Sequence, residues 1–243
     1  QILDSRIAIY RQNPASPGQF LPPSHHPYGT TSAKAHDLAT ADLQLNGLAD
    51  VIATSWDEGG FRAFQSDNTL PGSLLPVVHY PLGPANSSFG HSQAIADIDA
   101  DGFPDIVRVT DETVYWFPQD GGNLGEFLSP IAIGPGMDDV VTGDMNNDGL
   151  ADIVVLRGDG ILADDIAVYL NNTNSPSQFL APITVPVPIT PDHLGLADFD
   201  DNGLMDIAVG GQLTDLDYNP ADDGRFMAVR QYAPNQFAAS DLL

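Results

Sequence analysis

The sequence has no cysteine among its 243 residues, which excludes a disulfide framework, a thiolate nucleophile and a cysteine-ligated zinc site. Basic residues are also scarce, because 8 Lys and Arg stand against 33 Asp and Glu and give a formal net charge of -25. A surface this negative repels phosphate groups. We therefore expect neither nucleic-acid binding nor docking on an anionic membrane.

Long apolar runs and active-site motifs are missing too. No segment approaches the roughly 18 apolar residues of a membrane-spanning helix, so membrane insertion is not expected. Gln1 begins no signal-peptide pattern, which predicts a mature or trimmed chain. The Gly-x-Ser-x-Gly elbow, the His-Glu-x-x-His pair, the Walker loop and the Gly-x-Gly-x-x-Gly fingerprint do not occur. The sequence predicts a globular protein that is not an enzyme.

What the sequence does contain is an internal repeat. An acidic stretch reads DLQLNGLADVI from Asp42 and recurs as DIDADGFPDI from Asp97, DMNNDGLADIV from Asp144 and DFDDNGLMDIA from Asp198. A second signature lies between these copies and at both ends, as FLPPSHHPYG, LLPVVHYPLG, FLSPIAIGPG, FLAPITVPVP and a degenerate FAASDLL. Alternating segments such as IAIYR, TVYWF and IAVYL precede this signature. One repeat is therefore strand, acidic loop and three further strands in about 50 residues, which is typical of a β-propeller blade.

The predicted fold is all-β, a single β-propeller over residues 1–243 with about four and a half four-stranded blades. The half blade covers 1–35, and the full blades cover 36–90, 91–137, 138–190 and 191–243. Because the half blade lacks its inner pair of strands, either the chain is cut from a longer protein or a neighbouring chain supplies the missing strands.

The acidic loops have the chemistry of a cage for a hard cation. Acidic or amide side chains stand at loop positions 1, 3 and 5, glycine at position 6 and aspartate at position 9. Alternate spacing turns side-chain oxygens toward one centre, and the carbonyl at position 7 can join them. Calcium accepts six to eight oxygens in flexible geometry, whereas magnesium prefers a tight octahedron, so the spacing favours calcium.

The predicted ligands fall into four sets, three of them strong and the earliest one weaker. They are Asp97, Asp99, Asp101, Asp105 and the carbonyl of Phe103; Asp144, Asn146, Asp148, Asp152 and Leu150; Asp198, Asp200, Asn202, Asp206 and Leu204; and, with only two carboxylates, Asp42, Gln44, Asn46 and Asp50. A solvated Asx-rich turn is the alternative for any single loop, but four copies in register disfavour it.

The segment FGHSQAIADIDADGFPDIVRV, residues 89–109, resembles the FG-GAP repeat of integrin α-subunits and the related VCBS-type repeats of secreted bacterial proteins. The resemblance implies a β-propeller with a calcium loop between the first two strands of each blade. It also implies a functionally broad family, with adhesion receptors, lectins and domains attached to polysaccharide lyases.

Several other residues offer weaker hypotheses. His36, His91 and His193, with Asp138 in the remaining repeat, stand just before the acidic loops, where they form either a ring that binds a metal or ligand or, as we favour, a polar cap. An adhesion tripeptide at 157–159, an acidic stretch at 215–223 and sequons at Asn86 and Asn171 are better explained as ordinary turns or surface. For the aromatic residues Trp56, Tyr115, Trp116 and Phe117 we expect core packing rather than a sugar platform.

The sequence as a whole predicts a secreted or cell-surface module, stabilised by calcium, that binds a carbohydrate or protein ligand. Extracellular calcium is abundant enough to fill weak sites, whereas cytosolic calcium is not. Two alternatives remain open: a structural subunit of an extracellular assembly whose incomplete N-terminal blade is completed by strands of a neighbouring chain, and the accessory propeller of a polysaccharide-degrading enzyme.

Overall fold

The structure, a computed structural model, describes residues 6–28, 35–55, 58–70, 72–82, 90–157, 165–187, 189–213 and 225–242. In this part of the chain, strands are the regular elements, eighteen in number, and there is no helix. No candidate for a membrane-crossing helix occurs among these residues.

The strands pair into five antiparallel sheets in chain order. The first sheet has two strands, β1 (Arg6–Ile9) and β2 (Ser24–Pro27). The other four sheets have four strands each: β3 (Ala35–Ala41), β4 (Asp50–Ser55), β5 (Glu58–Phe64) and β6 (Val78–Tyr80); β7 (Gly90–Ala96), β8 (Asp105–Thr110), β9 (Thr113–Phe117) and β10 (Ile131–Pro135); β11 (Val140–Gly143), β12 (Asp152–Arg157), β13 (Asp165–Tyr169) and β14 (Ile183–Pro186); and β15 (Ile189–Ala197), β16 (Asp206–Leu213), β17 (Arg225–Ala233) and β18 (Gln236–Leu242).

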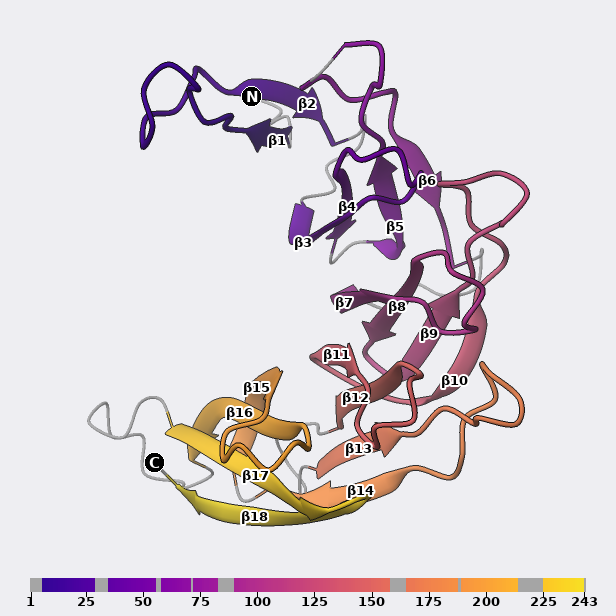
Figure 1. The fold of residues 1–243 in the computed structure, drawn as a ribbon, viewed down its shortest axis with the longest axis vertical. Coiled ribbons are helices and arrows are strands. Elements are labelled where there is room, and N and C mark those ends of the chain that lie inside the picture. The colour runs from indigo at the N-terminus through magenta and orange to yellow at the C-terminus, as the bar shows by residue number, and fades with distance from the viewer. Residues whose placement is uncertain are drawn as a thin grey trace.

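The five sheets follow one another along an open arc (Figure 1). The first strands, β3, β7, β11 and β15, lie on its concave side, and each contacts the next. The fourth strands lie on the convex side, and the β1–β2 and β15–β18 sheets form the two separate ends. The predicted order of strands within a repeat is therefore confirmed, and the sheets are consistent with propeller blades.

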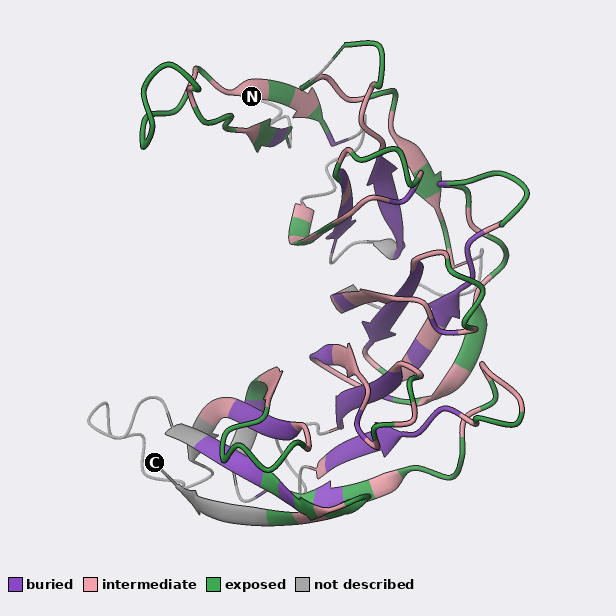
Figure 2. Cartoon of the chain, viewed as in Figure 1, coloured by how far each residue is buried: buried purple, intermediate pink, exposed green. Residues whose placement is uncertain are grey.

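The second strands of the internal sheets are buried on both faces because a neighbouring sheet packs on each side. In β8 and β12 nearly every residue is buried, and Figure 2 shows buried residues concentrated in the central strands. A strand covered on both faces reads as a continuous apolar run rather than an alternating one. This explains the short apolar runs in the segments DIVRV and DIVVL.

Successive sheets are held together by four apolar clusters, one at each junction. In β8, Ile106 packs toward the preceding sheet, whereas Val107 and Val109 pack toward the following one. Such alternation is what a strand between two layers requires, since successive side chains point to opposite faces. Each internal sheet therefore contributes to two junctions.

The junction between the β3–β6 and β7–β10 sheets is aromatic. The Phe61 ring meets the rings of Phe117 and Phe127 edge to face, with centroids 4.9 and 5.2 Å apart, and stacks on Tyr80 at 4.9 Å. Trp116 packs on the other side of the same sheet and is buried. Core packing is thus confirmed for Trp116 and Phe117, while Trp56 lies outside the described residues.

Candidate metal-binding loops and a polar pocket

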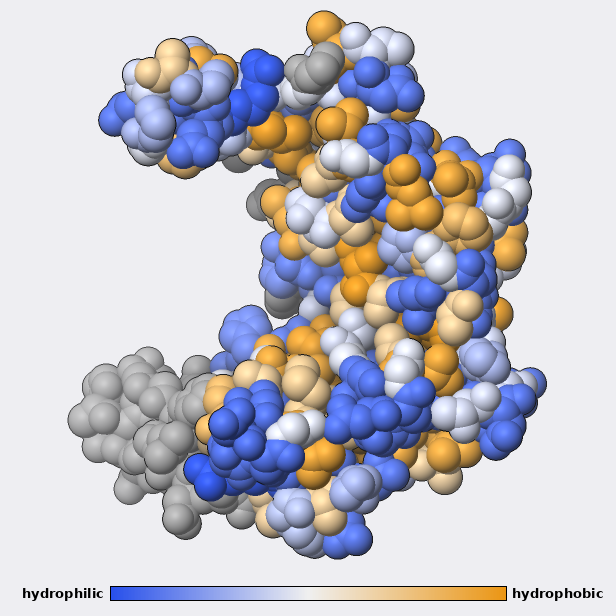
Figure 3. All heavy atoms as spheres, viewed as in Figure 1, coloured by the Kyte–Doolittle hydropathy of each residue, from blue (hydrophilic) through white to orange (hydrophobic). Residues whose placement is uncertain are grey.

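Each acidic loop connects the first and second strands of a four-stranded sheet. The loop that begins at Asp97 joins β7 to β8, and the loops that begin at Asp42, Asp144 and Asp198 hold the same place in their own sheets. Figure 3 shows strongly hydrophilic residues over the loops that precede β12 and β16. The predicted position of the loops between the first two strands is confirmed.

The aspartate at position 1 closes each loop through backbone hydrogen bonds. Asp97 Oδ1 accepts from the Asp101 N–H at 3.0 Å, and Oδ2 accepts from the Gly102 N–H at 2.9 Å. The other three loops repeat both bonds, with the carboxylates of Asp42, Asp144 and Asp198 as acceptors. Four loops of different sequence therefore share one backbone conformation.

Two positions in each loop adopt left-handed backbone conformations. Gly102, at position 6, has a φ of +91°, which an L residue with a side chain rarely adopts. Ala100, at position 4, has a φ of 58°, and the corresponding residues Leu45, Asn147 and Asp201 are also positive. The role of glycine follows from the sequence, but the second left-handed position does not, because its residue type varies.

The aspartate at position 9 fastens the loop to the rest of its sheet. Asp105 is almost fully buried; its Oδ2 accepts from the Ile98 N–H at 3.0 Å and its Oδ1 from the Gln119 N–H at 2.7 Å. Asp50, Asp152 and Asp206 make the same two bonds in their sheets. Burial raises the pKa of Asp105 and that of Asp152 to about 6.

The sequence did not reveal the residue near the end of the third strand whose backbone N–H donates to this aspartate. It is Ser66, Gln119, Asn171 or Gln231 in the four sheets. In the first three, this polar residue stands eight positions before the Phe or Leu that opens the second signature. That fixed spacing was the available signal.

The Asp97 and Asp198 loops bring carboxylates close enough for one ion. Oxygens of Asp97, Asp99 and Asp105 all lie within 4.8 Å of one another, as do those of Asp198, Asp200 and Asp206. Oxygens around one calcium ion lie at most about 5 Å apart, twice the bond length of 2.3–2.6 Å. Both groups therefore fit calcium.

The negative charges in the Asp97 loop repel one another when no cation is bound. The pKa of Asp99 is raised by burial and by the neighbouring carboxylates of Asp101 and Asp97. A bound divalent cation would reverse this shift, because it favours the ionised form of each ligand.

The other two loops differ in how their amides are used. In the Asp42 loop, Asn46 Nδ2 donates to Gln44 Oε1 at 3.0 Å, so the two predicted ligands bond to each other. In the Asp144 loop, Asn146 Nδ2 donates to Asp148 Oδ2 at 2.9 Å and turns its amide oxygen to the Asp148 N–H. Both arrangements put a donor where a cation needs an acceptor. We therefore predict weaker binding in both loops, and the weakest in the Asp42 loop, which has fewer carboxylates.

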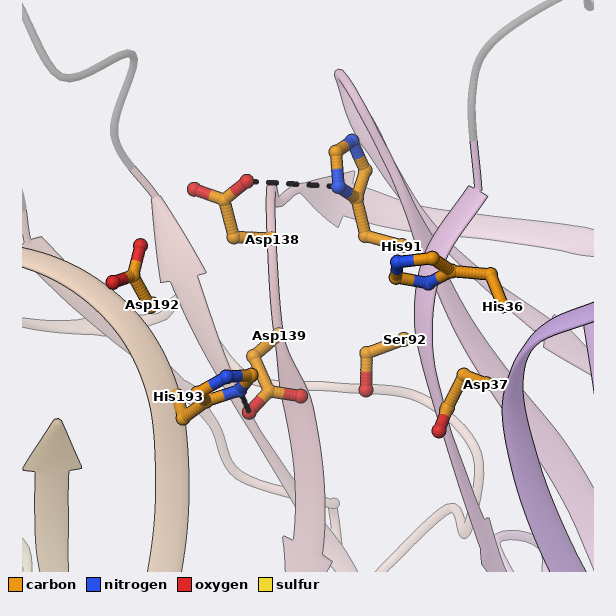
Figure 4. Close-up of a pocket in the computed structure, with 8 residues that line it drawn as sticks. All are labelled: His36, Asp37, His91, Ser92, Asp138, Asp139, Asp192 and His193. Atoms are coloured by element: carbon orange, nitrogen blue, oxygen red, sulfur yellow. Dashed lines mark ion pairs between the residues drawn. The ribbon is translucent and has the colours of Figure 1, made fainter. Parts of the chain in front are cut away.

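A polar pocket of about 640 Å³ lies near the beginning of the first strands, at the other end of these strands from the acidic loops. All four four-stranded sheets contribute to its wall. It is lined by His36, Asp37, His91, Ser92, Asp138, Asp139, Asp192 and His193, whose side chains surround an open space in Figure 4. The structure thus brings together the three histidines and the aspartate that the sequence aligned.

Two of the pocket's three imidazoles are paired with carboxylates. His91 Nε2 lies 2.5 Å from Asp111 Oδ1, and His91 Nδ1 lies 3.7 Å from Asp138 Oδ1 (Figure 4). His193 Nδ1 lies 3.8 Å from Asp139 Oδ2 (Figure 4), and that oxygen also accepts from the Leu194 N–H. Among the described residues, the groups able to hold a metal are the two acidic-loop groups, not this pocket. Its arrangement suits a polar or cationic ligand group better than a transition metal.

Residues of two minor sequence motifs, the adhesion tripeptide and a sequon, make structural contacts. Arg157 donates through Nε to Asp165 Oδ1 at 2.7 Å and through a terminal nitrogen to Thr184 Oγ1 at 2.9 Å, so β12–β14 hold the first residue of the adhesion tripeptide. The buried amide of Asn171 donates to the Ile98 and Ala151 carbonyls, which is incompatible with a glycan there. The rest of the tripeptide, the 215–223 stretch and Asn86 lie outside the described residues.

Comparisons with known proteins agree with this geometry. The FG-GAP-like repeat family matches residues 97–155 and 144–209, and each match contains two successive acidic loops. Integrin alpha-7 of Homo sapiens is 30% identical over 157 residues, which cover 56% of this chain. The chain spans 13% of the length of that protein. Residues 97–209 therefore form FG-GAP-like repeats, in a domain that is similar to part of an integrin alpha subunit.

Proposed function

We propose that this chain is part of an extracellular β-propeller, stabilised by calcium, that binds a protein ligand in adhesion. In this proposal each four-stranded sheet is a blade, and the first strands surround the propeller axis. The likeness to integrin alpha-7 supports an adhesion-type, non-enzymatic domain at the cell surface or outside the cell.

Calcium acts as a folding ligand in this proposal. The ion is held by Asp97, Asp99 and Asp105 in one loop and by Asp198, Asp200 and Asp206 in another. The carbonyls of Phe103 and Leu204 complete these spheres. Because the ninth aspartate also holds the second and third strands, binding of the ion stabilises the whole sheet. Millimolar extracellular calcium suits sites of this kind, which supports an extracellular location.

The single observation that carries the ligand-binding proposal is the polar pocket. Concave sites where several repeats converge are the usual places for ligands, since many side chains reach one point. The carboxylates of Asp37, Asp138, Asp139 and Asp192 give the pocket a negative wall. We therefore propose that it receives a lysine or arginine side chain of a protein ligand.

The test is binding of the calcium-loaded protein to an immobilised panel of extracellular proteins and to a glycan array. We expect protein binding that Asp138→Asn weakens by roughly tenfold, the effect of losing about 1.4 kcal/mol. Asp201→Asn is the matched control, because Asp201 has nearly the same left-handed φ (59° against 61° for Asp138), loses the same charge and lies outside the pocket. Binding only to glycans, or equal weakening by both variants, would contradict the proposal.

A further inference from the structure

The β11–β14 sheet reaches into the acidic loops of both neighbouring sheets through two asparagine side chains. Asn171 Nδ2 donates to the carbonyl of Ile98 at 2.7 Å, and Asn147 Nδ2 donates to the carbonyl of Gly203, also at 2.7 Å. Ile98 lies in the acidic loop before β8, and Gly203 lies in the acidic loop before β16. Among the described residues, these are the two loops whose carboxylate oxygens lie close enough together for one ion.

Asn171 makes its contact from a fixed position in the interior. It is 1% exposed, its backbone N–H donates to Asp152 Oδ1 at 2.7 Å, and its amide oxygen accepts the Ser177 N–H at 2.8 Å. The Ile98 carbonyl belongs to the peptide group that leads into Asp99, a predicted ligand. An asparagine held at three points therefore holds the backbone beside one of the calcium ligands.

Asn147 makes the equivalent contact on the other side of the sheet. The Gly203 carbonyl belongs to the peptide group that leads into Leu204, and the N–H of this peptide donates to Asn202 Oδ1 at 2.7 Å. The Asn202 side chain and the Leu204 carbonyl are both predicted ligands of that loop. The bond from Asn147 therefore holds a peptide group that lies between two ligands.

The corresponding residues of the two preceding sheets differ. At loop position 4, which Asn147 occupies in its own loop, they have Leu45 and Ala100, whose side chains carry no hydrogen-bond donor. Gln119, the counterpart of Asn171, donates to the Pro104 carbonyl of its own sheet at 2.8 Å. These two asparagines distinguish the β11–β14 sheet from the two sheets before it.

We propose that Asn147 and Asn171 are positioning residues for calcium in the two sheets that flank their own. Neither side chain is a predicted ligand of those loops, but each orients the backbone beside one, and groups behind the ligands of a metal typically change its affinity by about 10–100-fold. The inference rests on the proposed binding of calcium in the Asp97 and Asp198 loops. Because coupling is reciprocal, calcium in either loop should also strengthen the bond across the junction between sheets.

The experiment follows two backbone amide signals by NMR in the isotope-labelled full chain as calcium chloride is added. The signals are those of Gly102 and Gly203, whose N–H groups donate to Asp97 Oδ2 and Asp198 Oδ2. Each signal therefore reports calcium binding in its own loop, and the two affinities are measured in one titration.

Asn171→Ser removes the bond to the Asp97 loop. Serine suits this position, because Ser66 holds it in the β3–β6 sheet and donates through Oγ to a carbonyl of its own sheet at 2.6 Å. The variant loses the amide nitrogen that crosses the junction. It should weaken calcium binding at Gly102 by roughly tenfold and leave binding at Gly203 unchanged.

Asn147→Ala removes the bond to the Asp198 loop and should have the opposite selectivity. Alanine suits this position, because Ala100 adopts a φ of 58° at the same place in its own loop. Calcium binding at Gly203 should weaken by about threefold, less than in the first variant because this bond is exposed to water, and binding at Gly102 should not change.

The opposite selectivity of the two variants separates positioning from a general loss of stability, which would weaken both sites. Leu45→Ala is the matched control for Asn147→Ala, since Leu45 is exposed and has a φ of 51° at the same loop position, and it should change neither signal. Because Asn147 is exposed, its variant decides the question even if Asn171→Ser fails to fold.

The outcomes that contradict this inference differ from those that contradict calcium binding. Unchanged calcium binding at Gly203 in Asn147→Ala, or equal weakening at Gly102 and Gly203 by either variant, would overturn the positioning role alone. If neither glycine of the unaltered protein responded to calcium, the calcium proposal would be overturned and this inference with it.

Discussion

Asp105 Oδ1 accepts the backbone N–H of Gln119 at 2.7 Å, which joins the end of an acidic loop to the segment behind the third strand of the same sheet. Its second oxygen accepts the N–H of Ile98. One carboxylate therefore connects the start of the loop, the start of the second strand and the segment after the third strand. An ion bound by this carboxylate is therefore coupled to the order of the sheet, not only to that of the loop.

Asp105→Asn should destabilise the protein even without calcium. The amide keeps one acceptor oxygen but places a donor against a backbone N–H, and a buried unsatisfied donor costs about 1–3 kcal/mol. Chemical denaturation in a chelator measures the loss. Asp201→Asn, at an exposed loop position, is the control and should change the free energy of unfolding little. Equal stability of the Asp105→Asn variant and the unaltered protein would contradict the structural role.

Phe61→Ala should destabilise the junction between the second and third sheets of the chain. Phe61 is completely buried and contacts three other aromatic rings, so removing it costs about 3–5 kcal/mol. Leu128→Ala, at an exposed site, should stay within about 0.5 kcal/mol. A small effect of Phe61→Ala on the urea midpoint would show that the sheets do not depend on this junction.

The repeat in the sequence was sufficient to predict the strands, their order and the position of the acidic loops. Regular spacing sufficed because, in every copy of the loop, the first and ninth aspartates accept the same backbone hydrogen bonds. The curvature of the arc could not be predicted, since it depends on the angle between neighbouring sheets. The carboxylate pairing of His91 and His193 was also hidden, because its partners come from other loops or a neighbouring sheet.

The calcium-free protein should become more stable as pH falls from about 6 toward 4.5. Burial raises the pKa of Asp105 and Asp152 to about 6 from an ordinary value of 3.8, so the folded state binds these protons more readily than the unfolded state. The stability that these two protonated carboxyl groups add to the folded state is fully present below about pH 3.8. It is lost as pH rises through about 6. Below this window the trend reverses for Asp67 and Asp120, whose pKa values hydrogen bonds lower.

The measurement is thermal unfolding in a chelator across this pH range. Asp152→Asn should reduce the gain in stability between pH 6 and 4.5, because the amide does not titrate. In saturating calcium the trend should reverse, since protons compete with the ion for the same oxygens. A calcium-free protein that loses stability between pH 6 and 4.5 would contradict the assignment.

Gly102→Ala should strain the strongest loop without any steric clash. No atom lies within 4 Å of the position that a Cβ would take, but the φ of +91° disfavours a side chain by about 1–2 kcal/mol. Calcium titration by calorimetry should therefore show weaker binding as well as a lower melting temperature. Gly195→Ala is the control, because its Cβ would make only an ordinary contact at 3.8 Å. Unchanged calcium affinity in Gly102→Ala would count against the left-handed turn as a requirement for the site.

Thermal unfolding with saturating calcium and with a chelator at pH 7.5 tests the calcium proposal most directly. Calcium at 100 times its dissociation constant should stabilise each occupied site by about 2.7 kcal/mol and raise the melting temperature. Asp97→Asn with Asp99→Asn should remove part of this gain, and the corresponding change at Asp198 and Asp200 should remove a further part. Identical unfolding curves in calcium and in chelator would contradict calcium binding in all four loops.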